Sequence, residues 1–223
     1  MIRTARLCCL LLAGIVGFVP TEGRADEWAT WQSLNLKYLD TRKLDLVFYS
    51  DWRSSLDPSR FGGYLASQQV KFELHPNLIG GVNYTFLSLP TKHSDELIET
   101  HRAECEVVPH FKVDDWLEIA ARQRFELPWP EGHGGPSERT RHRIQLDFPI
   151  QHAGRLRSAF VYEEVFYDFE QHRVTENRLA PAGLSFRLAE KSSLSVFYTW
   201  QTVHTAGTRY ERHIVNTALS VSL

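Results

Sequence analysis

The chain has 223 residues, of which 43% are hydrophobic, 12% aromatic and 23% charged, and its formal net charge at pH 7 is -2. This length suits one domain with a full core or one closed barrel, and it excludes two large domains. The supply of apolar residues excludes a chain that is disordered throughout. The near-neutral charge argues against a nucleic-acid binder held by bulk electrostatics.

The N-terminus has the pattern of a secretory signal peptide. Two arginines precede an apolar run over residues 7–19, and a stretch of small residues ends at Ala25. The run is shorter than the ~20 residues that a spanning helix needs, which disfavours a membrane anchor. We expect residues 1–25 to be cleaved and residues 26–223 to form one domain with Cys105 as its single thiol.

The rest of the chain alternates apolar and polar residues with a period of two, as β-strands with one apolar face do. The clearest case has Leu194, Val196 and Tyr198 on one face and serine and threonine at most positions of the other. The pattern predicts strands at residues 30–39, 43–53, 63–74, 78–89, 98–110, 116–127, 139–149, 155–169, 176–188, 193–204 and 210–223.

These segments favour a membrane barrel over a soluble β-domain. Most have about ten to fourteen residues, whereas strands of soluble sandwiches commonly have ~5–6. Short connections alternate along the chain with longer ones at 54–62, 90–96, 127–138 and 171–175. Transmembrane barrels combine long strands, short periplasmic turns and longer outer loops. The sequence thus predicts an all-β protein, a closed antiparallel transmembrane β-barrel of about 10–12 strands in the bacterial outer membrane.

The strand number stays open between ten, eleven and twelve. Single-chain bacterial barrels have even numbers of strands, so either segment 30–39 is not a full strand or another segment is split. Apolar residues alternate to the last position, Leu223, which resembles the signal read by the barrel-assembly machinery. We therefore expect that machinery and outer-membrane lipid as partners, and no nucleic acid.

Charged residues concentrate on one face of three consecutive segments. A bare charge facing lipid costs about 2–4 kcal/mol at mid-membrane, so we expect these side chains to point inward. Pairing two of the segments about a turn at Val113 would place Glu104 opposite Arg122. The same pairing would place Arg102 opposite Arg124. This lumen charge ladder consists of Arg102, Glu104, Glu118, Arg122, Arg124, Glu126, Arg141, Arg143 and Asp147, with Glu106 and Arg139 on the same faces.

The ladder has two interpretations. In the first, each arginine pairs with a carboxylate of the ladder, and the network fills and stiffens a narrow lumen. In the second, the arginines line a narrow eyelet that favours anionic solutes.

No motif predicts a catalytic, cofactor or metal site. Lipid hydrolases need a serine activated by a histidine, but no His-x-Ser sequence occurs, and His93 and Ser94 are adjacent in an expected loop. A Ser/His/Asp set could still converge from distant strands. The histidines, His133 in a glycine-rich loop among them, lack the spacing of zinc ligands.

Several short stretches together resemble an uncharacterised family of bacterial outer-membrane β-barrels, classified only as a domain of unknown function. They are Glu164-Val165-Phe166, Glu176-Asn177-Arg178-Leu179 and Ala182-Gly183-Leu184-Ser185-Phe186, with the Trp31 segment and the arginine-rich middle. The resemblance covers nearly all of residues 26–223 and implies the fold and the compartment, but no activity. Compared with the pattern of that family, this sequence has one extra residue around Ala180-Pro181, which leaves the strand register of this segment open.

Within these stretches we expect an ion pair at the extracellular rim. Glu163 shares a face with apolar residues, so its neighbour Glu164 should point into the lumen. Arg178, on the next segment, could reach Glu164 across an outer loop. We interpret this pair as a structural contact that fastens the loop.

The sequence therefore predicts a non-enzymatic outer-membrane barrel of structural or narrow-pore type. The alternatives that stay open are a small anion-selective porin, a lipid-modifying enzyme on the same barrel, and a soluble periplasmic β-domain. The sequence does not identify a solute.

Overall fold

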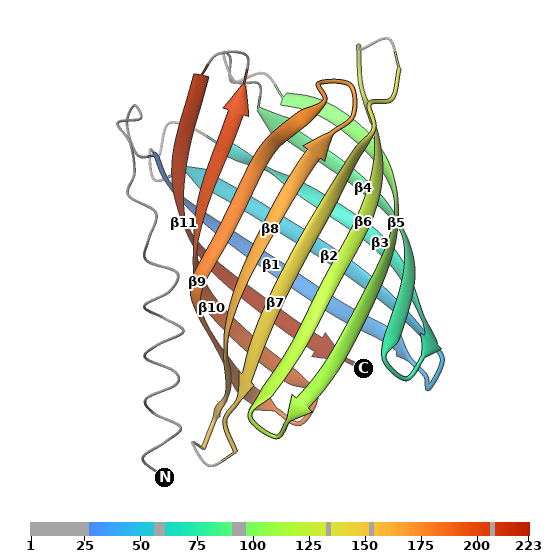
Figure 1. Cartoon of the computed structure of the whole chain (residues 1–223), viewed down its shortest axis with the longest axis vertical. Coiled ribbons are helices and arrows are strands. Elements are labelled where there is room, and N and C mark those ends of the chain that lie inside the picture. The colour runs from blue at the N-terminus through green and yellow to red at the C-terminus, as the bar shows by residue number, and fades with distance from the viewer. Residues whose placement is uncertain (1–26, 56–60, 91–96, 133–134, 152–153, 206–207) are drawn as a thin grey trace.

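The computed structural model describes residues 27–55, 61–90, 97–132, 135–151, 154–205 and 208–223, which form one closed β-barrel (Figure 1). Its strands are β1 (Glu27–Asp40), β2 (Leu44–Ser55), β3 (Phe61–His75), β4 (Leu78–Pro90), β5 (Leu97–Asp114), β6 (Leu117–Pro130), β7 (Arg139–Pro149), β8 (Leu156–Asp168), β9 (Arg173–Ala189), β10 (Ser192–Thr205) and β11 (Thr208–Ser222). This confirms the predicted all-β barrel.

Some predictions concern residues that the structure does not describe. The predicted signal peptide, residues 1–25, is one of them, and His93, Ser94 and His133 are others. Among the described residues, no helix is long and apolar enough to cross a membrane.

The barrel closes with an odd number of strands in the described chain. Neighbours in sequence pair antiparallel from β1 to β11, so β1 and β11 run in the same direction and their closing pair is parallel (Figure 1). The eleven described strands lie within the predicted range of about 10–12, whereas the two interpretations that would give an even number, loss of segment 30–39 and a split segment, are wrong. The expectation of wholly antiparallel pairing is wrong at this seam. Pairing of β1 with β11 gives hydrogen-bond partners to the backbone N–H and C=O groups of both strands, so neither of them is an unpaired edge strand.

The connections alternate between two ends of the barrel, which we name the turn end and the loop end. The chain passes from β1 to β2, from β3 to β4, from β5 to β6, from β7 to β8 and from β9 to β10 at the turn end, and the other connections between successive strands are at the loop end. The predicted strict alternation of short and long connections is wrong at two places. The connection from β7 to β8 at the turn end is long, and the connection from β10 to β11 at the loop end is short. The prediction is also wrong at residues 171–175, where pairing of Asp168 with Arg173 lets β9 begin earlier than expected.

Alternation along the strands separates an apolar outer face from a polar interior. Two small apolar clusters lie in the part of the interior formed by β1 and by β8 to β11: Ala29, Trp31 and Ile214, and Phe160, Tyr162 and Ala180 with Phe197 packed against them. The outer face exposes large apolar side chains, including Phe48, Trp52, Val82, Tyr84, Val107, Phe111, Ile144, Leu184, Val196 and Val215. The interior is therefore a mixed core in which apolar groups adjoin charged ones.

The extra residue expected near Pro181 forms a β-bulge in β9. One two-residue step of β8, from Phe160 to Tyr162, spans three residues of β9, from Gly183 to Ala180, and the pairing with β10 shifts at the same place. Proline has no N–H for the ladder, so a bulge accommodates it. Beside the bulge, a Cβ on Gly183 would lie 2.3 Å from the Phe160 ring, so only glycine lets this ring lie across the strand.

Candidate functional site

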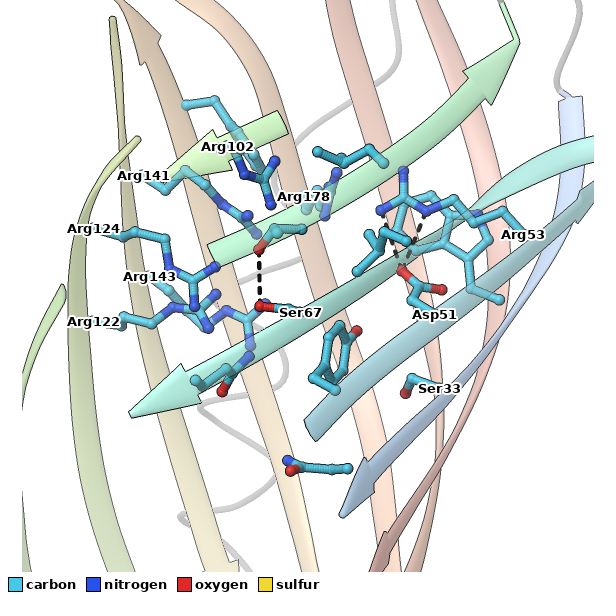
Figure 2. A pocket seen from close by; sticks show the side chains of 18 of the residues that line it. Ser33, Asp51, Arg53, Ser67, Arg102, Arg122, Arg124, Arg141, Arg143 and Arg178 are labelled. Carbon is cyan, nitrogen blue, oxygen red and sulfur yellow. Dashed lines mark hydrogen bonds and ion pairs between the residues drawn. The ribbon is translucent and has the colours of Figure 1, made fainter. Parts of the chain in front are cut away.

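The interior holds a network of arginines and carboxylates on β5 to β9. Strand alternation turns the charged face of each of these strands toward the lumen. Figure 2 shows Arg102, Arg122, Arg124, Arg141 and Arg143 along one wall of a cavity, with Asp51 and Arg53 across from them. The structure therefore shows a lumen charged by arginine–glutamate ion pairs.

The strand register differs from the expected one. Glu104 lies opposite Glu126 and Glu106 lies opposite Arg124, whereas Arg102 lies opposite Pro128. The predicted pairs Glu104–Arg122 and Arg102–Arg124 are therefore wrong. The hairpin turns at residues 115–116 instead of at Val113, which moves each partner by an even number of residues. An even shift keeps the faces and changes only the partners.

Between β6 and β7 this register places like charges opposite each other. Arg122 lies opposite Arg143, and Arg124 lies opposite Arg141. Like charges directly opposite destabilise a sheet unless something neutralises them. Carboxylates from β5, β6 and β8 form ion pairs with these arginines and neutralise their charge.

Glu164 on β8 is one of the two carboxylates of the described network that contact four arginines each; the other is Glu126. Its side chain is fully buried and lies 2.5 Å from Arg122, 3.0 Å from Arg141 and 3.1 Å from Arg143. Arg178 lies 4.0 Å away. The expected rim pair of Glu164 with Arg178 is therefore a long contact inside the network, and the other three arginines are closer because they converge from β6 and β7.

Glu126 on β6 forms the second centre. Its fully buried side chain lies 2.5 Å from Arg139, 2.9 Å from Arg141 and 3.7 Å from Arg102. Arg141 thus bridges Glu126 and Glu164 and joins the two centres. Charge-assisted hydrogen bonds of this kind are stronger than neutral ones, so the network is rigid.

Arg124 joins the carboxylates of β5. It lies 2.8 Å from Glu104 and 2.6 Å from Glu106. Glu104 has further partners, since Arg102 lies 2.6 Å from it and Asn83 and Thr85 donate hydrogen bonds to it. Among the described ion pairs, Arg124 is the only partner of Glu106.

Two members of the predicted ladder lie apart from this network. Glu118 and Asp147 are opposite each other near the turn end and belong to none of the described ion pairs. Asp147 instead accepts a hydrogen bond of 2.8 Å from Gln145. These carboxylates do not pair with the arginines of the ladder, because they lie too far toward the turn end.

Sequence reasoning missed part of the site. Asp51 and Arg53 on β2 pair at 3.2 Å, and Glu176 pairs with Arg178 at 2.5 Å on β9. Lys71 on β3 also lines the cavity. Strand alternation is the signal that could have found these residues, but each strand carries only one or two of them, and a search for dense charge overlooks them.

The sequence profile of a family described as "Protein of unknown function (DUF2490)" matches residues 28–212. The chain belongs to the DUF2490 family. The match confirms the predicted resemblance to a domain of unknown function and supplies no activity. No curated protein matches the chain, and no solved structure does.

The cavity inside this DUF2490 barrel has a volume of about 350 Å³ and is lined from all the described strands. Its lining is strongly basic. Nine basic and two acidic side chains line it among the residues that the structure describes: Arg53, Lys71, Arg102, Arg122, Arg124, Arg139, Arg141, Arg143 and Arg178, and Asp51 and Glu176.

The DUF2490 cavity lacks the parts of a hydrolase or metal site in the described chain. None of its described lining residues is a histidine, so Ser33 and Ser67 have no imidazole base in the cavity. No group of three histidine, cysteine, aspartate or glutamate residues that could hold a metal ion occurs within the described ranges. The arrangement can hold charge and bind an anion.

Proposed function

We propose that this protein is an integral outer-membrane β-barrel of structural type, whose lumen is closed by the arginine–glutamate network. The observation that carries the proposal is the inverted distribution of side chains. Glu126 and Glu164 are fully buried inside the barrel, whereas Ile144 is 59% exposed and Val82 is 49% exposed on its outer face. Large apolar surfaces facing outward and charges facing inward suit lipid as the surroundings.

Polar side chains on the outer face support this proposal because they are hydrogen-bonded to one another. In lipid, an unsatisfied polar group has no water to bind, so neighbouring side chains must satisfy it. Tyr84 contacts His101 at 2.6 Å, and Asn177 donates a hydrogen bond of 3.0 Å to Glu163. Two further pairs are Gln123–His142 and Tyr198–His213.

In this proposal the long connections at the loop end face outward from the cell and the turn end faces the periplasm. The apolar outer side of β11 suits insertion by the barrel-assembly machinery, because that machinery handles terminal strands of this pattern. The signal peptide expected in residues 1–25 would direct the chain across the inner membrane.

A small anion-selective pore is the second candidate, and the basic lining of the cavity favours it. Rings of arginine select anions in open channels. The shared ion pairs around Glu126 and Glu164 favour the closed barrel, because each of these carboxylates ties arginines from two or more strands together.

Fractionation of the producing cells tests the proposed location. We expect the protein in the outer-membrane fraction, with an electrophoretic mobility that changes on heating because the folded barrel resists the detergent. An outer-membrane porin and a soluble periplasmic protein serve as markers. Recovery of the chain with the soluble marker would refute the proposal.

Cys105 allows a second test of the membrane position. It is a free cysteine on the outer face of β5, between the inward-facing Glu104 and Glu106. If lipid covers Cys105, a membrane-impermeant maleimide should label it at least about ten-fold more slowly than a solvent-exposed cysteine, because the reaction needs a hydrated thiolate.

The control is a solvent-exposed cysteine, introduced as Glu170→Cys in a Cys105→Ser background, since Glu170 is exposed at the loop end. Labelling is followed by mass spectrometry on isolated outer membranes. Equal labelling rates for Cys105 and the Glu170→Cys variant would mean that the outer face of β5 is in water, against the proposal.

A further inference from the structure

The network leaves the cavity with excess positive charge. The carboxylates Glu104, Glu106, Glu126 and Glu164 do not line the cavity, although the arginines that they bind do. Their side chains are at most 2% exposed. The negative groups therefore lie against the barrel wall, and the guanidinium groups stand between them and the cavity.

The arginines also retain unused donors. The buried Nε atoms of Arg122, Arg141 and Arg143 have no hydrogen-bond partner. A guanidinium group has five N–H donors, and Arg122 and Arg143 each donate one hydrogen bond to Glu164. A buried donor without a partner costs free energy, so these arginines are not fully satisfied by the network.

Aromatic rings hold these guanidinium groups in place. Arg143 lies 4.2 Å above the ring of Tyr162, and Arg141 lies 4.5 Å above that of Phe166. Across the cavity, Arg53 lies 4.2 Å above the ring of Trp31. Such stacking fixes the plane of a guanidinium group, so a ligand finds its donors already oriented.

We infer that the cavity is a binding site for a small oxyanion with at least two negative charges, recognised through phosphate or carboxylate groups by Arg122, Arg141 and Arg143. Guanidinium groups bind both kinds of oxyanion through paired hydrogen bonds. The volume of about 350 Å³ lies at the small end of the range for ligand pockets, which excludes a lipid or a polymer as the whole ligand.

Titration calorimetry on the purified, folded barrel in detergent tests this inference. The probes are inorganic phosphate, pyrophosphate and citrate, each added at constant ionic strength against sodium chloride. We expect saturable binding of at least one multivalent probe and a matching rise in the unfolding temperature, because a ligand that binds only the folded state stabilises it. Pyrophosphate and citrate distinguish phosphate from carboxylate recognition.

Arg122→Gln is the diagnostic variant. Glu164 keeps Arg141 and Arg143 as partners in this variant, so the barrel should still fold, while the dissociation constant should rise about ten-fold or more through loss of an orienting charge. Arg143→Gln serves in the same way if Arg122→Gln is not recovered folded. The matched control is Arg212→Gln, since Arg212 pairs with Glu27 and does not line the cavity.

Absence of saturable binding by all three probes would overturn the inference. Unchanged affinity in both Arg122→Gln and Arg143→Gln would overturn it as well. Because the measurement uses purified protein, it is independent of where the protein resides in the cell, and a negative result leaves the proposed outer-membrane location intact.

Discussion

Glu164→Gln is expected to lower the free energy of unfolding of the barrel by about 3–5 kcal/mol, the usual cost of breaking a buried ion pair from one side. Glutamine keeps the shape of the side chain and removes its charge. Arg122, Arg141 and Arg143, all within 3.1 Å of Glu164, would then be left close together. Because Arg122 and Arg143 lie directly opposite each other, their repulsion would no longer be neutralised.

Glu163→Gln is a closely matched control. Glu163 precedes Glu164 on the same strand but faces outward, where its carboxylate accepts a hydrogen bond from Asn177 that glutamine can also accept. Urea unfolding of the refolded barrels in lipid vesicles gives both stabilities. Equal unfolding midpoints for Glu164→Gln and Glu163→Gln would show that the network does not hold the barrel together.

Arg124→Ala should also destabilise the barrel by about 3–5 kcal/mol, for a complementary reason. It removes the only described ion-pair partner of Glu106, whereas Glu104 keeps Arg102. A buried carboxylate without a partner is the source of the cost. Arg187→Ala is the control, since Arg187 is exposed at the turn end of β9.

A second substitution separates charge from packing. If the unpaired carboxylate causes the loss, adding Glu106→Gln to Arg124→Ala should restore part of the stability, because a neutral amide is less costly to bury. Thermal unfolding of the single and double variants measures this coupling. A double variant whose loss equals the sum of the two single losses would point to packing instead.

Conductance of the unmodified protein distinguishes the closed barrel from the pore. We expect no well-defined channel in planar bilayers, and a low or noisy conductance in Arg124→Ala, because the proposed closed barrel leaves no continuous path for ions. In a wet eyelet the charges would be screened, so the same truncation would cost little stability. A steady, anion-selective conductance from the unmodified protein would therefore favour the pore.

The sequence by itself determined the strands and their faces. Side chains on a strand alternate with a period of two, so Glu104 and Arg124 could be placed on inward faces without knowledge of any partner. Cys105, between two inward glutamates, could be placed on the outer face by the same reasoning. The extra residue near Pro181 likewise indicated where the ladder would be irregular.

Only the tertiary structure decided which charges meet. The alternation of faces is unchanged when a strand shifts by two residues, so it could not show whether Glu104 lies opposite Arg122 or Glu126. The position of the turn, at residues 115–116, places Glu104 opposite Glu126. The parallel seam of β1 and β11 depends on closure of the whole sheet. The meeting of arginines from β6 and β7 at Glu164 of β8 depends on the registers of two hairpins at once, and no local pattern in a sequence records such a relation.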